Sequence, residues 1–297
     1  VDAISLEDKL FVTRELSRRG ATIEELNFVR RHLSKIKGGG LARSCRANTI
    51  MTMIMSDVIG DPLETIASGP TVAAERDPAH ALSILKKYLR QEIPESIKIY
   101  LAEIGRQNSQ AESSCNVFNQ IIGSNAIALN ACEQAAEKLG FDFVNTGSFN
   151  QGEAHLLAQK IIREALNQGE KISKPLCLLY GGETTVSLNG VDVPGKGGRN
   201  QEVALAVVQE LNKHPKLADR FVLIAGGTDG EDGPTDAAGG FADLDVIRQS
   251  EKMNLSPADF LARHDAYHFL ESCSGLLKTG PTHTNVMDIT IALIWPN

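Results

Sequence analysis

Residues 195–202 read Gly-Lys-Gly-Gly-Arg-Asn-Gln-Glu, and they lead into a helical pattern over 201–212. Consecutive glycines leave backbone N–H groups open to an anion, and a helix N-terminus favours negative charge. We therefore predict that Gly197, Gly198 and Asn200 bind a phosphate or carboxylate, with Arg199 gripping it as a catalytic residue through its forked guanidinium. A flexible loop between a strand at 184–188 and the helix is the weaker alternative. The spacing of a Walker A loop is absent.

Residues 226–236 form a second candidate, a glycine-rich acidic turn after a strand expected over 221–225. Mg²⁺ binds through carboxylate oxygens and waters. We predict that Asp229 and Asp232 hold this metal ion or that one of them orients a reacting hydroxyl, with Asp229 as the catalytic candidate. Thr228 is a candidate for ligand binding in the same turn. The alternative is a solvated acidic turn.

Further turns place polar side chains beside expected strands. Asp57 ends the apolar run that begins at Thr49, which we interpret as a buried strand of a parallel sheet, and this carboxylate is a catalytic candidate. An aspartate that only caps the turn, as at Asp61, is an equally strong interpretation. Helix capping or turn capping is likewise an alternative for several of the binding candidates. These binding candidates are Ser68, Ser124, Asn125, Glu183, Thr282 and Asn285.

Two histidines have a spacing that metal sites also use. His264 and His268 lie four residues apart on one expected helix, within a mostly helical stretch over 257–273. No third ligand is evident, so we favour ordinary helix residues. No Gly-x-Ser-x-Gly elbow is present, and acyl-transfer chemistry is therefore a poor fit.

Composition excludes several classes of partner. The 297 residues carry a net charge of −7 without a basic block, so we expect no nucleic-acid partner. No run of about 20 apolar residues occurs, so we expect no membrane span. The 5 cysteines are widely spaced and include no Cys-x-x-Cys pair, which indicates a reducing compartment rather than disulfides or a zinc site.

The elements that must position these residues alternate between strands and helices, which predicts an α/β sandwich. Residues 117–144 have the pattern of one β-α-β unit, and ligands in such sheets bind beyond the carboxyl ends of the strands. We expect the domain change between residues 105 and 117. The other expected helices cover 6–19, a stretch from the N-cap Thr22 to Ile36, 78–105 with a break at Pro94, and 152–169; further strands cover 176–180 and 286–294.

Together these segments resemble the type 2 glycerate kinases, whose C-terminal part is called the MOFRL domain. The similarity extends from about Ile4 to Ile294, and the motifs occur in the family's order. The glycines at 38–40 look closer to the animal enzymes. The motifs that carry the resemblance are residues 33–42, 56–62, 66–71, 122–125, 181–185, 195–202, 226–234 and 279–288.

The resemblance implies ATP-dependent phosphorylation of D-glycerate to 2-phosphoglycerate with Mg²⁺. It implies an α/β fold with a cleft between a Rossmann-like parallel-sheet domain, N-terminally incomplete here, and a smaller MOFRL domain with a mixed sheet. We expect boundaries at 1–110, 111–170 and 171–297, the middle part being a connecting unit. Arg199 matches an arginine proposed for the family's active site. A cytoplasmic location, or a mitochondrial one, and a homodimer are further expectations.

The chain departs from the family at its start. Family members carry an additional N-terminal stretch with a Gly-Lys-Ala-type loop, whose lysine is thought catalytic, before the segment that matches Ile4–Lys9. We therefore expect this chain alone to phosphorylate glycerate poorly or not at all. The rival function is a non-catalytic module that binds a sugar phosphate or acid phosphate. A nicotinamide dehydrogenase ranks last, because Gly-x-Gly-x-x-Gly does not follow a strand.

Overall fold

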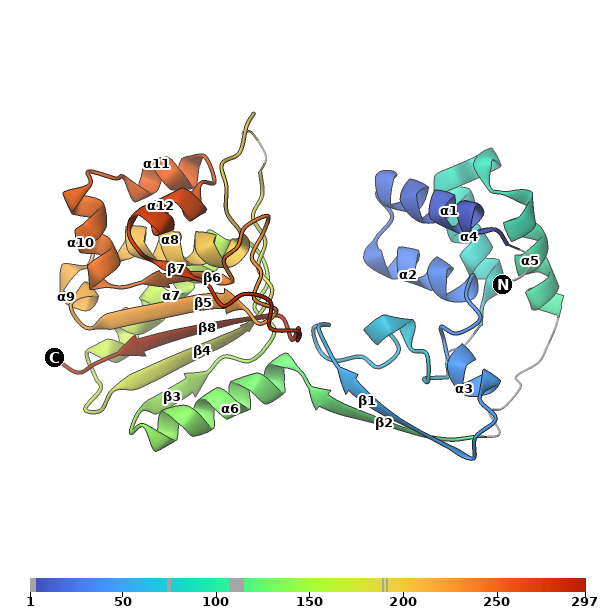
Figure 1. The fold of residues 1–297 in the computed structure, drawn as a ribbon, viewed down its shortest axis with the longest axis horizontal. Helices are drawn as coiled ribbons and strands as arrows, with labels where there is room; N and C mark the ends of the chain where they lie inside the picture. Colours follow the sequence, from blue (N-terminus) through green and yellow to red (C-terminus); the bar gives the residue numbers. More distant parts are fainter. Residues whose placement is uncertain (1–3, 74–75, 107–114, 189, 191) are drawn as a thin grey trace. The chain divides into compact units, whose positions relative to one another are not determined.

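The computed structural model describes residues 4–73, 76–106, 115–188, 190 and 192–297. The chain divides into two compact units (Figure 1). Unit 1 comprises Val1–Ile54 and Asp61–Ile122, and unit 2 comprises Met55–Gly60 and Gly123–Asn297. Most of the segment in which we expected the domain change, 107–114, lies outside the described residues. The boundaries expected at 110 and 170 stay predictions.

Four helices of unit 1 enclose its core. Helix α1 (Leu6–Arg18) is capped by Ser5, and α2 (Ile23–His32) carries the capping box between Thr22 and Glu25 that the sequence predicted. Their buried side chains pack with those of α4 (Pro78–Leu89) and α5 (Glu95–Arg106). The short elements of unit 1 are α3 (Gly40–Ser44), η1 (Ile66–Ser68) and η2 (Arg90–Glu92).

The end of α2 differs from the prediction. The helix ends at His32 and does not continue to Ile36. The Ser34 hydroxyl accepts hydrogen bonds from the backbone N–H groups of Ile36 and Lys37, a local alternative to helical hydrogen bonding. The glycines after this turn pair with the segment around Ser68, since Gly38 N donates to Ser68 O at 2.9 Å.

The strands β1 (Thr49–Met55) and β2 (Asn116–Gly123) form a two-stranded sheet. They run parallel, because Asn48 pairs with Asn116 at one end and Ser56 with Gly123 at the other. The expected β-α-β unit over 117–144 is therefore wrong, since β2 and the next strand belong to different sheets. The expectation that 49–57 is buried is also wrong: the exposed fractions of Met51 and Met53 are 73% and 70%.

Unit 2 contains a six-stranded sheet in the order β3-β4-β8-β5-β6-β7. Strand β3 (Asp142–Asn145) runs parallel to β4 (Leu176–Gly182), and every other pairing is antiparallel. The mixed sheet and the α/β class are as expected. The remaining strands are β5 (Phe221–Gly227), β6 (Gly239–Ala242), β7 (Leu276–Leu277) and β8 (Asp288–Ile294).

Helices cover both faces of this sheet (Figure 1). On one face α6 (Asn125–Lys138) buries Leu129 and Ala136 against Cys177 and Leu179 of β4. On the other face α7 (Ala154–Gly169) and α8 (Arg199–Leu211) contribute to the larger core, which includes the alternate β4 side chain Leu178. The shorter helices of unit 2 are α9 (Pro215–Ala218), α10 (Leu244–Lys252), α11 (Pro257–Ala262) and α12 (Ala266–Ser272).

Two further expectations in unit 2 are wrong. Residues 184–188 form no strand and make only one isolated bridge, between Thr185 and Glu153, after the chain turns at Gly182 with φ +138°. The stretch 257–273 is broken at His264, whose φ is 53°, so His264 and His268 do not share a helix. Among the described residues, no helix is long and apolar enough to cross a membrane.

Candidate functional site

The glycine-rich loop leads into α8, which begins at Arg199, two residues earlier than expected. Its N-cap is Gly198, which has no side chain to satisfy the first N–H groups of the helix. Asp232 from the acidic turn supplies the cap instead, accepting hydrogen bonds from Asn200 N at 3.0 Å and Gln201 N at 2.9 Å. A Cβ on Gly198 would lie 2.3 Å from Cγ of Asp232, so this approach requires glycine.

Both carboxylate oxygens of Asp232 are held by hydrogen bonds from the protein. The side-chain amides of Asn200 and Gln201 add two further hydrogen bonds, at 3.3 Å and 3.0 Å, so each carboxylate oxygen accepts two. Only 2% of the residue is exposed. Burial raises the pKa of Asp232 to about 6, against the lowering effect of the Gln201 and Asn200 donors. A metal ion could use this carboxylate only by displacing protein donors.

Arg199 lies between two carboxylates. Its Nε and Nη2 donate to Oδ2 and Oδ1 of Asp288 at 2.6 Å and 2.9 Å, which is a bidentate pair. Its Nη1 lies 2.9 Å from Oε1 of Glu183. These contacts raise the pKa of Arg199, with the Asp288 hydrogen bonds as the largest cause. The guanidinium is therefore charged and fixed in direction.

Asp288 is one of the site residues that were not predicted from the sequence. It starts β8 and lies in register with Gly182 of β4 and Gly227 of β5, so it occupies the point where three strand ends meet. Only 6% of it is exposed. The signal was available, because Asp288 is an acidic residue at the start of the apolar segment 289–294.

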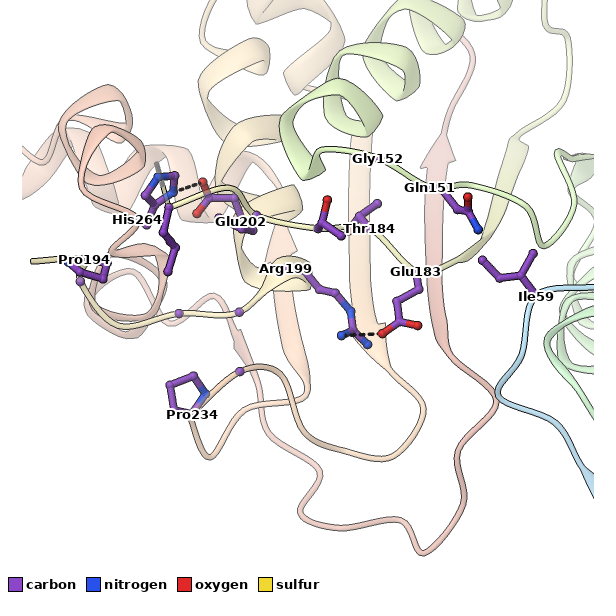
Figure 2. A pocket seen from close by; sticks show the side chains of 17 residues that line it. Ile59, Gln151, Gly152, Glu183, Thr184, Pro194, Arg199, Glu202, Pro234 and His264 are labelled. Carbon is purple, nitrogen blue, oxygen red and sulfur yellow. Dashed lines mark hydrogen bonds and ion pairs between the residues drawn. The ribbon is translucent and has the colours of Figure 1, made fainter. Parts of the chain in front are cut away.

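A pocket of about 750 Å³ opens beside Arg199 (Figure 2). Of the predicted residues, Glu183, Gly197, Gly198 and Arg199 line it. Glu202 and His264, which the sequence did not single out as a pair, also line it, and Nδ1 of His264 lies 3.0 Å from Oε1 of Glu202. Figure 2 shows this pair and the Arg199–Glu183 pair in different parts of the pocket.

Lys196 belongs to the same loop but does not line this pocket. Its ammonium lies 3.7 Å from the centre of the Tyr267 ring, a cation–π contact. The loop therefore contributes its glycines and Arg199 to the pocket and directs its lysine elsewhere.

Several other predicted residues hold loops together at this edge of unit 2. Asn125 is buried and donates to the carbonyls of Val286 and Asp288 at 2.8 Å and 2.9 Å. Thr228 accepts from Val286 N and donates to the Met287 carbonyl. Thr282 N donates to the Asp229 carbonyl at 2.9 Å.

The remaining predicted site residues make local hydrogen bonds or, in one case, are exposed. Ser124 caps α6 by accepting from Ile127 N, and Asn285 accepts from Met287 N at 3.0 Å. Asp229 is half-buried and accepts from Glu231 N through Oδ1. Asp57 is exposed in unit 2, whereas Ser68 is buried in unit 1, where its hydroxyl lies 3.2 Å from Nζ of Lys37.

Within the described part of the chain, no group of three or more His, Cys, Asp or Glu side chains is arranged to hold a metal ion. His264 and His268 pair instead with carboxylates, His268 Nδ1 lying 2.6 Å from Oδ1 of Asp265. Within the described residues, none of the 5 cysteines belongs to a disulfide.

Comparison with known proteins gives two family matches. Residues 176–288 match the MOFRL family, and residues 1–102 match a domain of unknown function (DUF4147). A glycerate kinase of Rattus norvegicus is 39% identical over 100% of this chain, which spans 64% of that relative. A glycerate kinase of Macaca fascicularis is 38% identical and is covered to 85% of its length.

Glycerate kinases of more distant organisms are similar to this chain as well. A glycerate 2-kinase of Pyrococcus horikoshii is 39% identical over 99% of this chain and 66% of its own length. The crystal structure of a glycerate kinase from Thermotoga maritima superimposes with a TM-score of 0.87 at 35% identity, covering 99% of this chain and 69% of that one. The chain thus spans about two thirds of the length of most of these relatives.

Proposed function

We propose that this chain, which belongs to the glycerate kinase family, serves the transfer of a phosphoryl group from ATP to D-glycerate, giving 2-phosphoglycerate. The single observation that carries the proposal is the pocket beside Arg199, where a fixed guanidinium lies next to a helix N-terminus and a glycine loop. Phosphoryl transfer depends mainly on positioning and on neutralising charge. A fixed cation beside a glycine loop supplies both.

The roles of the residues follow from their positions. Arg199 would hold a phosphate or the glycerate carboxylate through the donors that Asp288 leaves open, together with the backbone at Gly197 and Gly198. Glu183, whose side chain is 46% exposed, is the partner that such an anion would replace. Asp288 is a positioning residue, because it binds Arg199 and is not among the residues that line the pocket.

Mg²⁺ fits the acidic turn at Asp229 better than at Asp232. Oδ2 of Asp229 makes no hydrogen bond with the described part of the chain, whereas both oxygens of Asp232 are fully engaged. Mg²⁺ commonly uses one or two carboxylates together with waters and phosphate oxygens. When bound, it would neutralise charge on the transferred phosphate. The catalytic role expected of Asp57 stays a prediction, as do the homodimer and the compartment.

A coupled assay for ADP tests this function directly. With ATP, Mg²⁺ and D-glycerate, we expect ADP formation that requires glycerate, at a low rate in this chain alone, and 2-phosphoglycerate as the product identified by ³¹P NMR. Calorimetry with each ligand tests the rival function, a non-catalytic module that binds a sugar phosphate or acid phosphate. Ligand binding without any ADP formation would support that module. Replacing Arg199 by Ala should abolish most of the turnover, and normal turnover in this variant would refute its role.

A further inference from the structure

The pocket contains a second polar centre, the pair formed by Glu202 and His264. Glu202 lies in the first turns of α8, and His264 follows α11, so two separate elements bring the pair together. Figure 2 shows them away from the Arg199–Glu183 pair, with Thr184 between. A second hollow of about 380 Å³ shares Glu202 and His264 with the pocket and adds Glu153 and His155 to the lining.

Both members of the pair retain an unused acceptor. Glu202 is only 7% exposed, yet its Oε2 has no hydrogen-bond partner among the described residues. Burial raises the pKa of Glu202, and the hydrogen bond from His264 opposes that rise. When Nδ1 of His264 donates to the carboxylate, Nε2 of a neutral ring is an acceptor as well. A nearly buried carboxylate with a free oxygen that faces a hollow is an acceptor for a ligand that donates hydrogen bonds.

The pocket is much larger than a three-carbon acid requires. At roughly 30 Å³ for each water-sized group, the seven heavy atoms of glycerate need on the order of 200 Å³. The pocket's volume of about 750 Å³ is in the range of sites for drug-sized ligands. Val186, Leu188 and Pro194 contribute an apolar wall to the lining of the pocket. An anionic group, a hydroxyl-bearing group and a flat apolar group could all be accommodated.

We infer that this pocket binds the nucleotide, with the phosphates toward Arg199 and the ribose hydroxyls donating hydrogen bonds to the Glu202–His264 pair. The inference rests on the proposed function, because it assigns the phosphoryl donor of that reaction to one site. The two ribose hydroxyls match the two free acceptors of the pair. The base then lies against the apolar wall, and the neighbouring hollow leaves room for water beside the ribose.

Calorimetry with modified nucleotides tests the assignment. The 297-residue chain is titrated, in the presence of Mg²⁺, with ADP, 2′-deoxy-ADP and 3′-deoxy-ADP. A hydrogen bond to a charged acceptor is strong, so we expect ADP to bind about tenfold more tightly than at least one deoxy form. The variant Glu202→Ala should reduce that ratio to about one. Glu202→Gln keeps the size of the side chain and should give an intermediate ratio, even if the alanine variant folds poorly.

The matched control lies on the same helix. Glu210 pairs with Lys213 and does not line the pocket, so Glu210→Ala should keep the full ratio. ADP binding without discrimination in the unmodified chain, or discrimination retained in both Glu202 variants, overturns the inference while glycerate-dependent ADP formation still stands. Failure to bind any of the three nucleotides, with no turnover of ATP, overturns both the inference and the proposed function.

Discussion

Arg199 is a single positive charge between two carboxylates of very different exposure. The side chain of Asp288 is 8% exposed, and that of Glu183 is 46% exposed. An exposed ion pair contributes little to stability, whereas a buried bidentate pair is strong and directional. We therefore expect Asp288 to fix the direction of the guanidinium and Glu183 to exchange with ligand.

Replacing Asp288 by Asn tests this division of roles. The amide keeps the shape but loses the charge and one acceptor, so Arg199 should lose its fixed direction. We expect kcat/KM for D-glycerate phosphorylation to fall about 10- to 100-fold. Glu183→Gln, the matched change at the exposed partner, should cost clearly less. Equal losses in the two variants would contradict the distinction.

Asp232 has a pKa that can be measured separately. Its pKa of about 6 in the folded chain lies above the ordinary value of about 3.9. Between these values the folded protein holds a proton that the unfolded chain has released. The stability that protonation of Asp232 adds is therefore complete below about pH 4 and is lost as the pH rises through about 6, a change of about 3 kcal/mol.

A ¹³C titration of labelled aspartate carboxyls would locate this transition. We expect one resonance with a midpoint near pH 6, and Asp232→Asn should remove that resonance and no other. A spectrum in which every aspartate titrates below pH 4.5 would show that the hydrogen-bond donors outweigh burial.

Residues whose type alone indicates chemistry could be predicted from the sequence. Gly197, Gly198 and Arg199 were found because glycines and arginine in one loop are typical of anion sites, and the structure brings them into one pocket. Asp288 and Glu202 were not recognised, because their surroundings come from segments far away in the chain: Asp288 pairs with Arg199, and Glu202 with His264.

At the scale of elements, α8 is a buried helix whose N-terminal cap comes from a residue far away in the sequence. All of its residues from Asn200 to Val208 are buried, and its first N–H groups depend on Asp232. Removing that carboxylate would leave buried donors without a partner, at a cost of about 1–3 kcal/mol each.

Asp232→Ala should therefore lower the free energy of unfolding of unit 2 by on the order of 3 kcal/mol. Asp229→Ala, in the same turn but with only one backbone hydrogen bond to its side chain, serves as the control and should cost much less. Urea denaturation measures both variants at pH 7. Similar midpoints for the two would argue against a capping role for Asp232.

Local signals explain which elements could be predicted. The capping box at Thr22 and Glu25 depends on residues three apart, and the structure contains it. The residues at 184–188 have strand-like composition but come just after Gly182, where a Cβ would lie 2.2 Å from the Asn150 carbonyl oxygen. Tertiary contact ends the strand there, and no local pattern reveals it.

At the scale of the whole molecule, alternation of strands and helices predicted the α/β class but not the strand partners. The pairing of β2 with β1 and of β3 with β4 depends on contacts across many residues, so the β-α-β prediction failed. The two units of the chain each have a hydrophobic core of their own, around Leu85 in unit 1 and around Leu178 in unit 2.

Because each unit has its own core, we predict that the two units unfold separately. We expect two thermal transitions in calorimetry. Leu85→Ala should lower the midpoint temperature of one, and Leu178→Ala that of the other, by on the order of 10 °C. The reason is that deleting a buried leucine side chain costs about 2–5 kcal/mol. A nucleotide that binds beside Arg199 stabilises only the unit that binds it. ADP with Mg²⁺ should therefore raise the transition that Leu178→Ala lowers and leave the other in place. A single transition that both variants lower equally would mean that the two cores unfold as one.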